Sequence, residues 1–149
     1  MHSQNSKTAT NYRHRGGIYP TLGFVLAANR RVLRVSGDAQ SVVLNQGSLE
    51  SAVNAPVESA GNQEAYPYLF DKVAALTYRL VSGHVFADGN KRTGLAVAET
   101  VLHWNKHNIS ANDETVTLVM LLLASGHLDV DGLRTSLLYM CGVDPSTVT

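Results

Sequence analysis

The ten residues from His84 to Thr93 concentrate groups that are suited to chemistry on a phosphate. They read His-Val-Phe-Ala-Asp-Gly-Asn-Lys-Arg-Thr. Histidine side chains titrate near pH 6.5, so His84 could accept a proton at neutral pH. The carboxylate of Asp88 offers the hard oxygen that Mg²⁺ prefers. We therefore interpret His84 as a candidate catalytic base and Asp88 as a candidate metal ligand.

The residues that follow Asp88 are suited to bind phosphate. Gly89 lets the backbone bend and approach a ligand closely. Asn90, Lys91 and Arg92 donate hydrogen bonds, the lysine as a point charge and the arginine as a planar fork. Apolar periodicity on both sides predicts two helices, so the loop would open at a helix N-terminus, which favours anions. Phe86 is interpreted as an apolar peg that holds the loop on the core.

Residue types alone leave a simpler interpretation open, because Asp-Gly-Asn-Lys is also common in turns. Two better-known motifs are excluded. A P-loop requires glycine directly before the lysine, and Asn90 stands there instead. An EF-hand requires spaced acidic ligands and a closing glutamate, which the segment lacks.

The segment resembles the signature of the Fic/Doc superfamily, whose pattern is His-x-Phe-x-(Asp/Glu)-Gly-Asn-x-Arg. Every fixed position is met, by His84, Phe86, Asp88, Gly89, Asn90 and Arg92. Lys91 and Leu95 stand where AMP-transferring Fic proteins carry a second glycine and a second arginine, so the segment is more similar to the Doc (death-on-curing) branch. Shorter boxes similar to Doc proteins occur at 19–22, 47–52 and 66–74, and the resemblance spans about residues 18–142.

The resemblance implies a Doc-like toxin of a type II toxin–antitoxin pair. Such a toxin transfers phosphate from ATP to a protein hydroxyl, on a Thr of translation elongation factor Tu, and inhibits translation. His84 would act as the base and Asp88 would hold Mg²⁺, while residues 89–92 would bind the phosphates. The expected partner is a small Phd-like antitoxin, in a groove that we place near the first helix and residues 47–52.

Two other functions remain open. A Fic-type AMP-transferase would modify a protein hydroxyl with the same loop and the nucleotide reversed. A catalytically inactive module would bind nucleotide or a partner without turnover. An inhibitory Fic motif is not expected, because the nearest match, Ser110 to Glu114, is followed by Thr115 and lies after the signature.

Composition indicates a single cytoplasmic domain. The 149 residues are 44% hydrophobic, which suits one core. The single cysteine, Cys141, excludes an internal disulfide framework and fits a reducing compartment. The first 17 residues contain no apolar signal segment, and the longest apolar run, 118–124, is too short to cross a membrane. We therefore expect no membrane partner.

Charge is distributed unevenly although the chain is neutral overall. Residues 1–34 contain six basic and no acidic residues, so the remainder carries a net charge of −6. The favoured interpretation is a solvated helix face and a flexible basic tail, and we expect no DNA binding by this chain alone. Polar composition predicts a disordered leader over 1–17, a Fic/Doc domain over 18–143 and a tail over 144–149.

The remaining sequence predicts an all-α fold, a Fic/Doc-like helical bundle in which the active-site loop opens a central helix. Helices are expected over 21–33 with Thr21 as N-cap, 48–53 with Ser48 as N-cap, 67–81, from the signature to about 107, 113–126 and 129–142. Residues 54–64 are expected to be loop, and 42–44 and 108–110 are too short to form a sheet.

Other candidate residues have weaker patterns. His103 and His107 are four residues apart, but the third ligand and adjacent acid of a zinc site are missing. Arg79 could reach a phosphate, although a salt bridge is favoured. Cys141 is interpreted as a small buried residue and not as a nucleophile.

Overall fold

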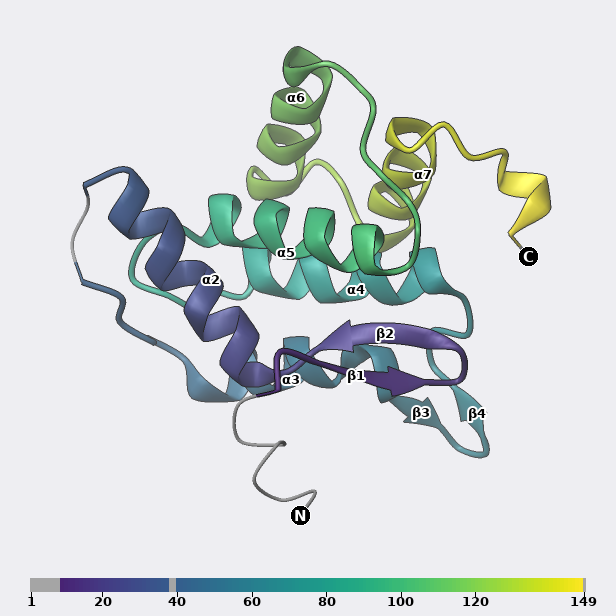
Figure 1. The fold of residues 1–149 in the computed structure, drawn as a ribbon, viewed down its shortest axis with the longest axis horizontal. Helices are drawn as coiled ribbons and strands as arrows, with labels where there is room; N and C mark the ends of the chain where they lie inside the picture. The colour runs from purple at the N-terminus through teal and green to yellow at the C-terminus, as the bar shows by residue number, and fades with distance from the viewer. Residues whose placement is uncertain (1–8, 38–39, 149) are drawn as a thin grey trace.

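The computed structural model describes residues 9–37 and 40–148, and the chain is mostly helical, as expected (Figure 1). The helices are α2 (Leu22–Val35), α3 (Gln46–Asn54), α4 (Leu69–Ser82), α5 (Asn90–Trp104), α6 (Asp113–Ala124) and α7 (Val130–Met140), with short 3₁₀ turns η1 (Ala55–Val57) and η2 (Pro145–Thr147). Two small antiparallel hairpins pair β1 (Asn11–His14) with β2 (Gly17–Pro20) and β3 (Ser59–Ala60) with β4 (Gln63–Glu64).

Helices α4 and α5 lie side by side through the middle of the molecule, with α6 and α7 on one side and the hairpins on the other (Figure 1). The wide apolar pattern of α4 is explained by burial on several sides, because it contacts α3, α5, α6 and α7. Gly94 permits the close approach of α5, since a Cβ atom there would lie 2.4 Å from Cγ2 of Val81. The expectation of a central helix after the signature is confirmed.

Side chains that accept backbone N–H groups determine where helices α2 and α3 begin. Thr21 caps α2 as predicted, with its Oγ1 accepting the N–H of Phe24 at 3.2 Å. The prediction that Ser48 caps the next helix was wrong. Asn45 offers an equally good acceptor three residues earlier, and its Oδ1 accepts the N–H of Ser48 at 2.9 Å.

The N-terminal hairpin contradicts the prediction of a disordered leader through residue 17. Residues 11–14 pair with 17–20, and the turn between them contains Arg15 and Gly16, both with positive φ. The rings of Tyr12 and Tyr19 are 6.2 Å apart, and Tyr12 contacts the core. These aromatic contacts outweigh the polar composition of the strand. The part of the predicted leader over residues 1–8 lies outside the described residues.

The predicted loop and tail also contain structure. Residues 54–64 include η1 and the β3–β4 hairpin, so they are not purely loop. In the predicted tail, η2 is followed by Val148, which packs against the core, while Thr149 lies outside the described residues. Within the described residues, no helix combines the length and the apolar character that crossing a membrane would require.

Candidate active site

The signature segment connects α4 to α5. Helix α4 ends at Ser82 and is capped by Gly83, whose N–H donates to the carbonyl of Arg79 at 3.0 Å. His84 follows with φ of +49°, a left-handed conformation that is uncommon for residues other than glycine. Its side chain is exposed, whereas the next two residues are buried. The chain therefore holds an exposed imidazole at a strained position between two fixed segments, an arrangement found at functional sites.

The segment 42–45 fixes the start of the loop. The N–H of Leu44 donates to the carbonyl of Val85 at 2.8 Å, and the N–H of Ala87 donates to the carbonyl of Val42 at 2.9 Å. Phe86, the predicted peg, is 1% exposed and lies in the core. These contacts hold the backbone of residues 85–87 against both the core and a neighbouring segment.

Asn90 closes the loop with its own side chain. Its Oδ1 accepts the N–H of Phe86 at 2.9 Å, and its Nδ2 donates to the carbonyl of Phe86 at 2.8 Å. Because both ends of the amide are used, the side chain shapes the loop. Any contribution of Asn90 to phosphate binding would come from its backbone N–H, at the N-terminus of α5.

Gly89 is required by both conformation and space. It precedes α5 with φ of +78°. A Cβ atom there would lie 3.2 Å from Cδ2 of Leu33 and 3.3 Å from Nδ2 of Asn29. The loop therefore turns where side chains of α2 lie close to its backbone.

Asn29 is a residue of the site that the sequence reasoning missed. It is fully buried on α2, and its Nδ2 donates to the carbonyl of Asp88 and to Oγ1 of the buried Thr93, both at 3.0 Å. Its Oδ1 accepts the hydroxyl hydrogen of Ser41. Asn29 thus ties the loop, α5 and the segment before α3 together. The sequence signal that could have identified Asn29 is its polar side chain on the same helix face as the apolar Val25 and Leu33.

Asp88 has one carboxylate oxygen engaged. Its Oδ1 accepts the N–H of Gly89 at 2.7 Å and lies 3.8 Å from Nη2 of Arg92. No donor among the described residues contacts Oδ2, and the side chain is 55% exposed. This oxygen fits a hard cation that is shared with phosphate oxygens. Across residues 9–37 and 40–148, no three His, Cys, Asp or Glu residues form a metal site, so the substrate would have to supply further ligands.

Lys91 and Arg92 occupy the first turn of α5. Lys91 is exposed. Arg92 contacts α2 through the carbonyl of Val32 at 3.4 Å and through the hydroxyl of Ser36. The structure therefore brings residues 86–92 into one connected turn. It places His84 directly before this turn, between the end of α4 and the buried Val85.

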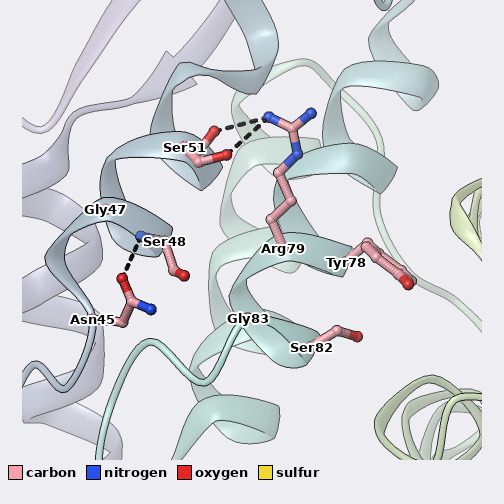
Figure 2. Close-up of a pocket in the computed structure, with 8 residues that line it drawn as sticks. All are labelled: Asn45, Gly47, Ser48, Ser51, Tyr78, Arg79, Ser82 and Gly83. Carbon is pink, nitrogen blue, oxygen red and sulfur yellow. Dashed lines mark hydrogen bonds between the residues drawn. The ribbon is translucent and has the colours of Figure 1, made fainter.

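Two cavities adjoin the signature. The first, of about 440 Å³, lies between the start of α3 and the end of α4, and Gly83 is part of its wall. Figure 2 shows that its lining consists mainly of hydroxyl and amide side chains from these two helices. The second, of about 560 Å³, lies between α2 and α5, is mostly apolar and includes Arg92.

The candidate residues outside the signature contribute to the structure and not to the site. Arg79 forms two hydrogen bonds with the carboxylate of Glu58, at 2.8 and 3.0 Å, and these bonds lower the pKa of that carboxyl group. His103 contacts Oδ1 of Asn108, and the ring of His107 lies 5.0 Å from Phe70. Burial raises the pKa of the Cys141 thiol to about 11, which opposes a nucleophilic role.

Comparison with known proteins agrees with this geometry. A family model described as the Fic/DOC family matches residues 19–102, which include the signature. The chain is also similar to the protein named Toxin Doc of Mycolicibacterium smegmatis, with 43% identity over 70 residues. That match covers 47% of this chain and spans about half, 54%, of the length of the relative.

Proposed function

This chain belongs to the Fic/DOC family, and we propose that it is a Doc-like toxin that transfers phosphate from ATP to a hydroxyl group of a protein. One observation carries the proposal. The loop held by Asn29 and Asn90 ends at the N-terminus of α5, whose first N–H groups lack helical acceptors, and it also presents an exposed histidine and an exposed carboxylate.

The proposed reaction assigns a task to each group. The acceptor oxygen attacks the terminal phosphorus, the bond to the bridging oxygen of ADP breaks, and His84 takes the hydroxyl proton. The N–H groups of α5, with Lys91 and Arg92, offset the charge on the equatorial oxygens. Asp88 would hold Mg²⁺, which would supply positive charge to offset that of the phosphates.

Phosphoryl transfer is favoured over AMP transfer by two positions. Lys91 adds an exposed cation in the first turn of α5, and Leu95, where Fic enzymes carry a second arginine, packs against the core. The test uses ATP labelled at the γ or the α position, with purified elongation factor Tu as the acceptor. We expect label only from the γ position. Transfer only from the α position would establish the AMP-transferase alternative.

His84 provides the test of catalysis. The His84→Ala variant should lose at least about 10²-fold in transfer rate, the usual contribution of a general base, while keeping its melting temperature and nucleotide affinity. His103→Ala is the matched control, because His103 is exposed on α5 away from the loop. Nucleotide binding without transfer by the unmodified protein would favour the inactive-module alternative.

We also propose a small antitoxin as the partner, in line with the name of the relative. Within the segment 47–52 that we assign to the groove, Leu49 and Ala52 are fully buried, so a partner would contact the other residues. Gly47 and Ser51 are exposed and line the cavity between α3 and α4, and Glu50 is exposed outside it. Co-expression with a neighbouring small reading frame should relieve growth arrest, and unchanged arrest would count against this partner.

A further inference from the structure

We infer that the outer side of α6 is a docking surface for a basic amphipathic helix of another protein. This surface, which we call the leucine face, consists of Leu118, Leu121 and Leu122, with Glu114 one turn before them. The three leucines are 56%, 48% and 37% exposed. Because Leu121 and Leu122 follow Leu118 by three and four residues, the three side chains lie on one side of the helix.

Helix α6 is apolar on two sides, although the described residues cover only one of them. Its inner side places Val119, Met120 and Leu123 in the core and contacts α4, α5 and α7. Figure 1 shows α6 at the periphery, on the side of α4 and α5 that faces away from the hairpins. A helix that is apolar all round is usually buried, so the composition of α6 suits burial of its outer side by a second molecule.

The leucine face differs from the other exposed apolar positions of the protein. Val35 and Tyr139 are each exposed singly, on α2 and α7. Among the described residues, no other helix exposes more than one large apolar side chain. Single exposed apolar residues are common on protein surfaces, whereas a contiguous group of them marks an interaction site.

The charges next to the leucine face are negative. Residues 107–133 contain four acidic residues and no lysine or arginine. Asp113 and Glu114 are exposed in the first turn of α6, and neither pairs with a cation among the described residues. Loss of surrounding water first, and then the charge of Asp113, raises the pKa of Glu99 on the adjoining helix α5. A cationic partner is therefore complementary to this end of the leucine face.

The same charges disfavour other occupants. A second copy of the chain would bring its own Asp113 and Glu114 to the interface, and residues 107–133 offer no lysine or arginine to pair with them. An anionic membrane would be repelled, because helices that bind such surfaces carry lysine and arginine beside their apolar side. The dipole of α6 favours acids in its first turn, but it does not account for the exposed leucines. A helix with leucines on one side and basic residues beside them matches both features.

The leucine face is separate from the proposed catalytic site. None of its residues belongs to the signature or lines either of the two cavities beside it. Docking can therefore be measured without nucleotide, and its failure would leave the proposed function unaffected.

Two synthetic peptides of leucine and lysine test the inference on the full-length protein. Each has about 18 residues, long enough to form a helix. In the first peptide the leucines follow helical spacing, and the second has the same composition in scrambled order. Calorimetry at low salt gives the Kd for the unmodified protein, for the double variant Leu118→Gln/Leu121→Gln and for Glu114→Gln. Tyr139→Gln and Asp131→Asn are the matched controls, an exposed apolar residue and an exposed acid of α7.

We expect the amphipathic peptide to bind at least about tenfold more tightly than the scrambled one. The double variant should raise its Kd about tenfold or more, and Glu114→Gln should raise it about threefold. The two controls should stay within about twofold of the unmodified protein. All variants should keep their melting temperature, because the replaced side chains are exposed.

Each other outcome overturns the inference. Absence of binding, equal affinity for the two peptides, or an unchanged Kd in the double variant would exclude the leucine face as the docking surface. Equal effects of Glu114→Gln and Asp131→Asn would reduce the attraction to net charge. Self-association in sedimentation that the double variant abolishes would assign the face to a second copy. Binding to phosphatidylcholine vesicles that is lost in the same variant would assign it to a membrane.

Discussion

At the scale of single residues, the signature was readable because its groups are adjacent in the chain. The order from His84 to Arg92 predicted a candidate site without knowledge of the fold. Asn29 could not be found in this way, because its partners Asp88 and Thr93 are 59 and 64 residues away. Its contribution depends on how α2 packs against the loop, which local sequence does not specify.

Replacing Asn29 tests whether the loop depends on this contact. Asn29→Ala removes the hydrogen-bond partner of the Ser41 and Thr93 hydroxyl groups and of the Asp88 carbonyl. Thr93 is buried, so the loss of its partner costs about 1–3 kcal/mol. We expect lower stability and a rise of at least fivefold in the Kd for tripolyphosphate. Asn112→Ala, which removes the cap of α6 at a cost of about 1 kcal/mol, is the matched control. Equal tripolyphosphate affinity of the two variants would restrict Asn29 to a role in stability.

At the scale of secondary-structure elements, periodicity predicted the six helices of the described residues better than their ends. Helix α3 is capped by Asn45 and not by Ser48. Both side chains can accept an N–H group and they are three residues apart, so local sequence does not decide which of them caps the helix. The hairpin of β1 and β2 escaped prediction because its stability comes from Tyr12 against Tyr19 and from contacts with α4 and α5. The partners Lys72 and Asn105 are distant in sequence, and strand β1 itself is mostly polar.

The packing of α4 on α5 gives a prediction at this scale. Gly94→Ala places a Cβ atom 2.4 Å from Cγ2 of Val81, a β-branched side chain that adjusts poorly. We expect a loss of about 1–3 kcal/mol in the free energy of unfolding, measured by urea denaturation. Gly23→Ala on α2 is the control, because its nearest atom is 3.9 Å away and the helix should gain stability. The double variant with Val81→Ala should lose less than the sum of its single variants, and strict additivity would contradict the contact.

At the scale of the whole molecule, Glu64 joins three separate parts of the chain. Its carboxylate accepts from Lys72 of α4 at 2.6 Å and contacts His14 of β1 at 2.7 Å. Lys72 is 2% exposed and also donates to the carbonyl of Pro56. The hydrogen bond from Lys72 first, and then that with His14, lowers the pKa of Glu64 from 4.5 to about 2. The N-terminal hairpin is therefore fixed to the helical core by an ionised carboxylate.

This arrangement predicts how stability depends on pH. Because the pKa is lower in the folded state, the stabilisation is present above about pH 4.5 and is lost as the pH falls toward about 2. Glu64→Gln should be less stable than the unmodified protein at pH 7, since Lys72 loses its buried counter-charge. The difference in melting temperature between the two proteins should shrink between pH 4.5 and 2. A constant difference across this range would show that the carboxylate charge contributes nothing.

The N-terminal hairpin connects stability with the proposed site. Besides the contact of His14 with Glu64, the carbonyl of Thr10 accepts the N–H of Thr21 at 3.0 Å, directly before α2. Helix α2 carries Asn29, which holds the loop, and one wall of the cavity between α2 and α5. Loss of the hairpin should therefore affect both the start of α2 and the binding of nucleotide.

Two deletions test whether the N-terminal hairpin supports α2 and nucleotide binding or is dispensable. Removal of residues 1–17 takes away β1, its turn and the contacts of Thr10 and His14, so we expect a lower melting temperature and weaker ATP binding. Removal of residues 1–8 eliminates no contact that the structure describes and serves as the control. Both quantities are measured on the same preparations by thermal denaturation and calorimetry. If the longer deletion melts and binds ATP like the shorter one, the hairpin does not contribute, and α2 is positioned by its contacts with α3, α5 and the loop.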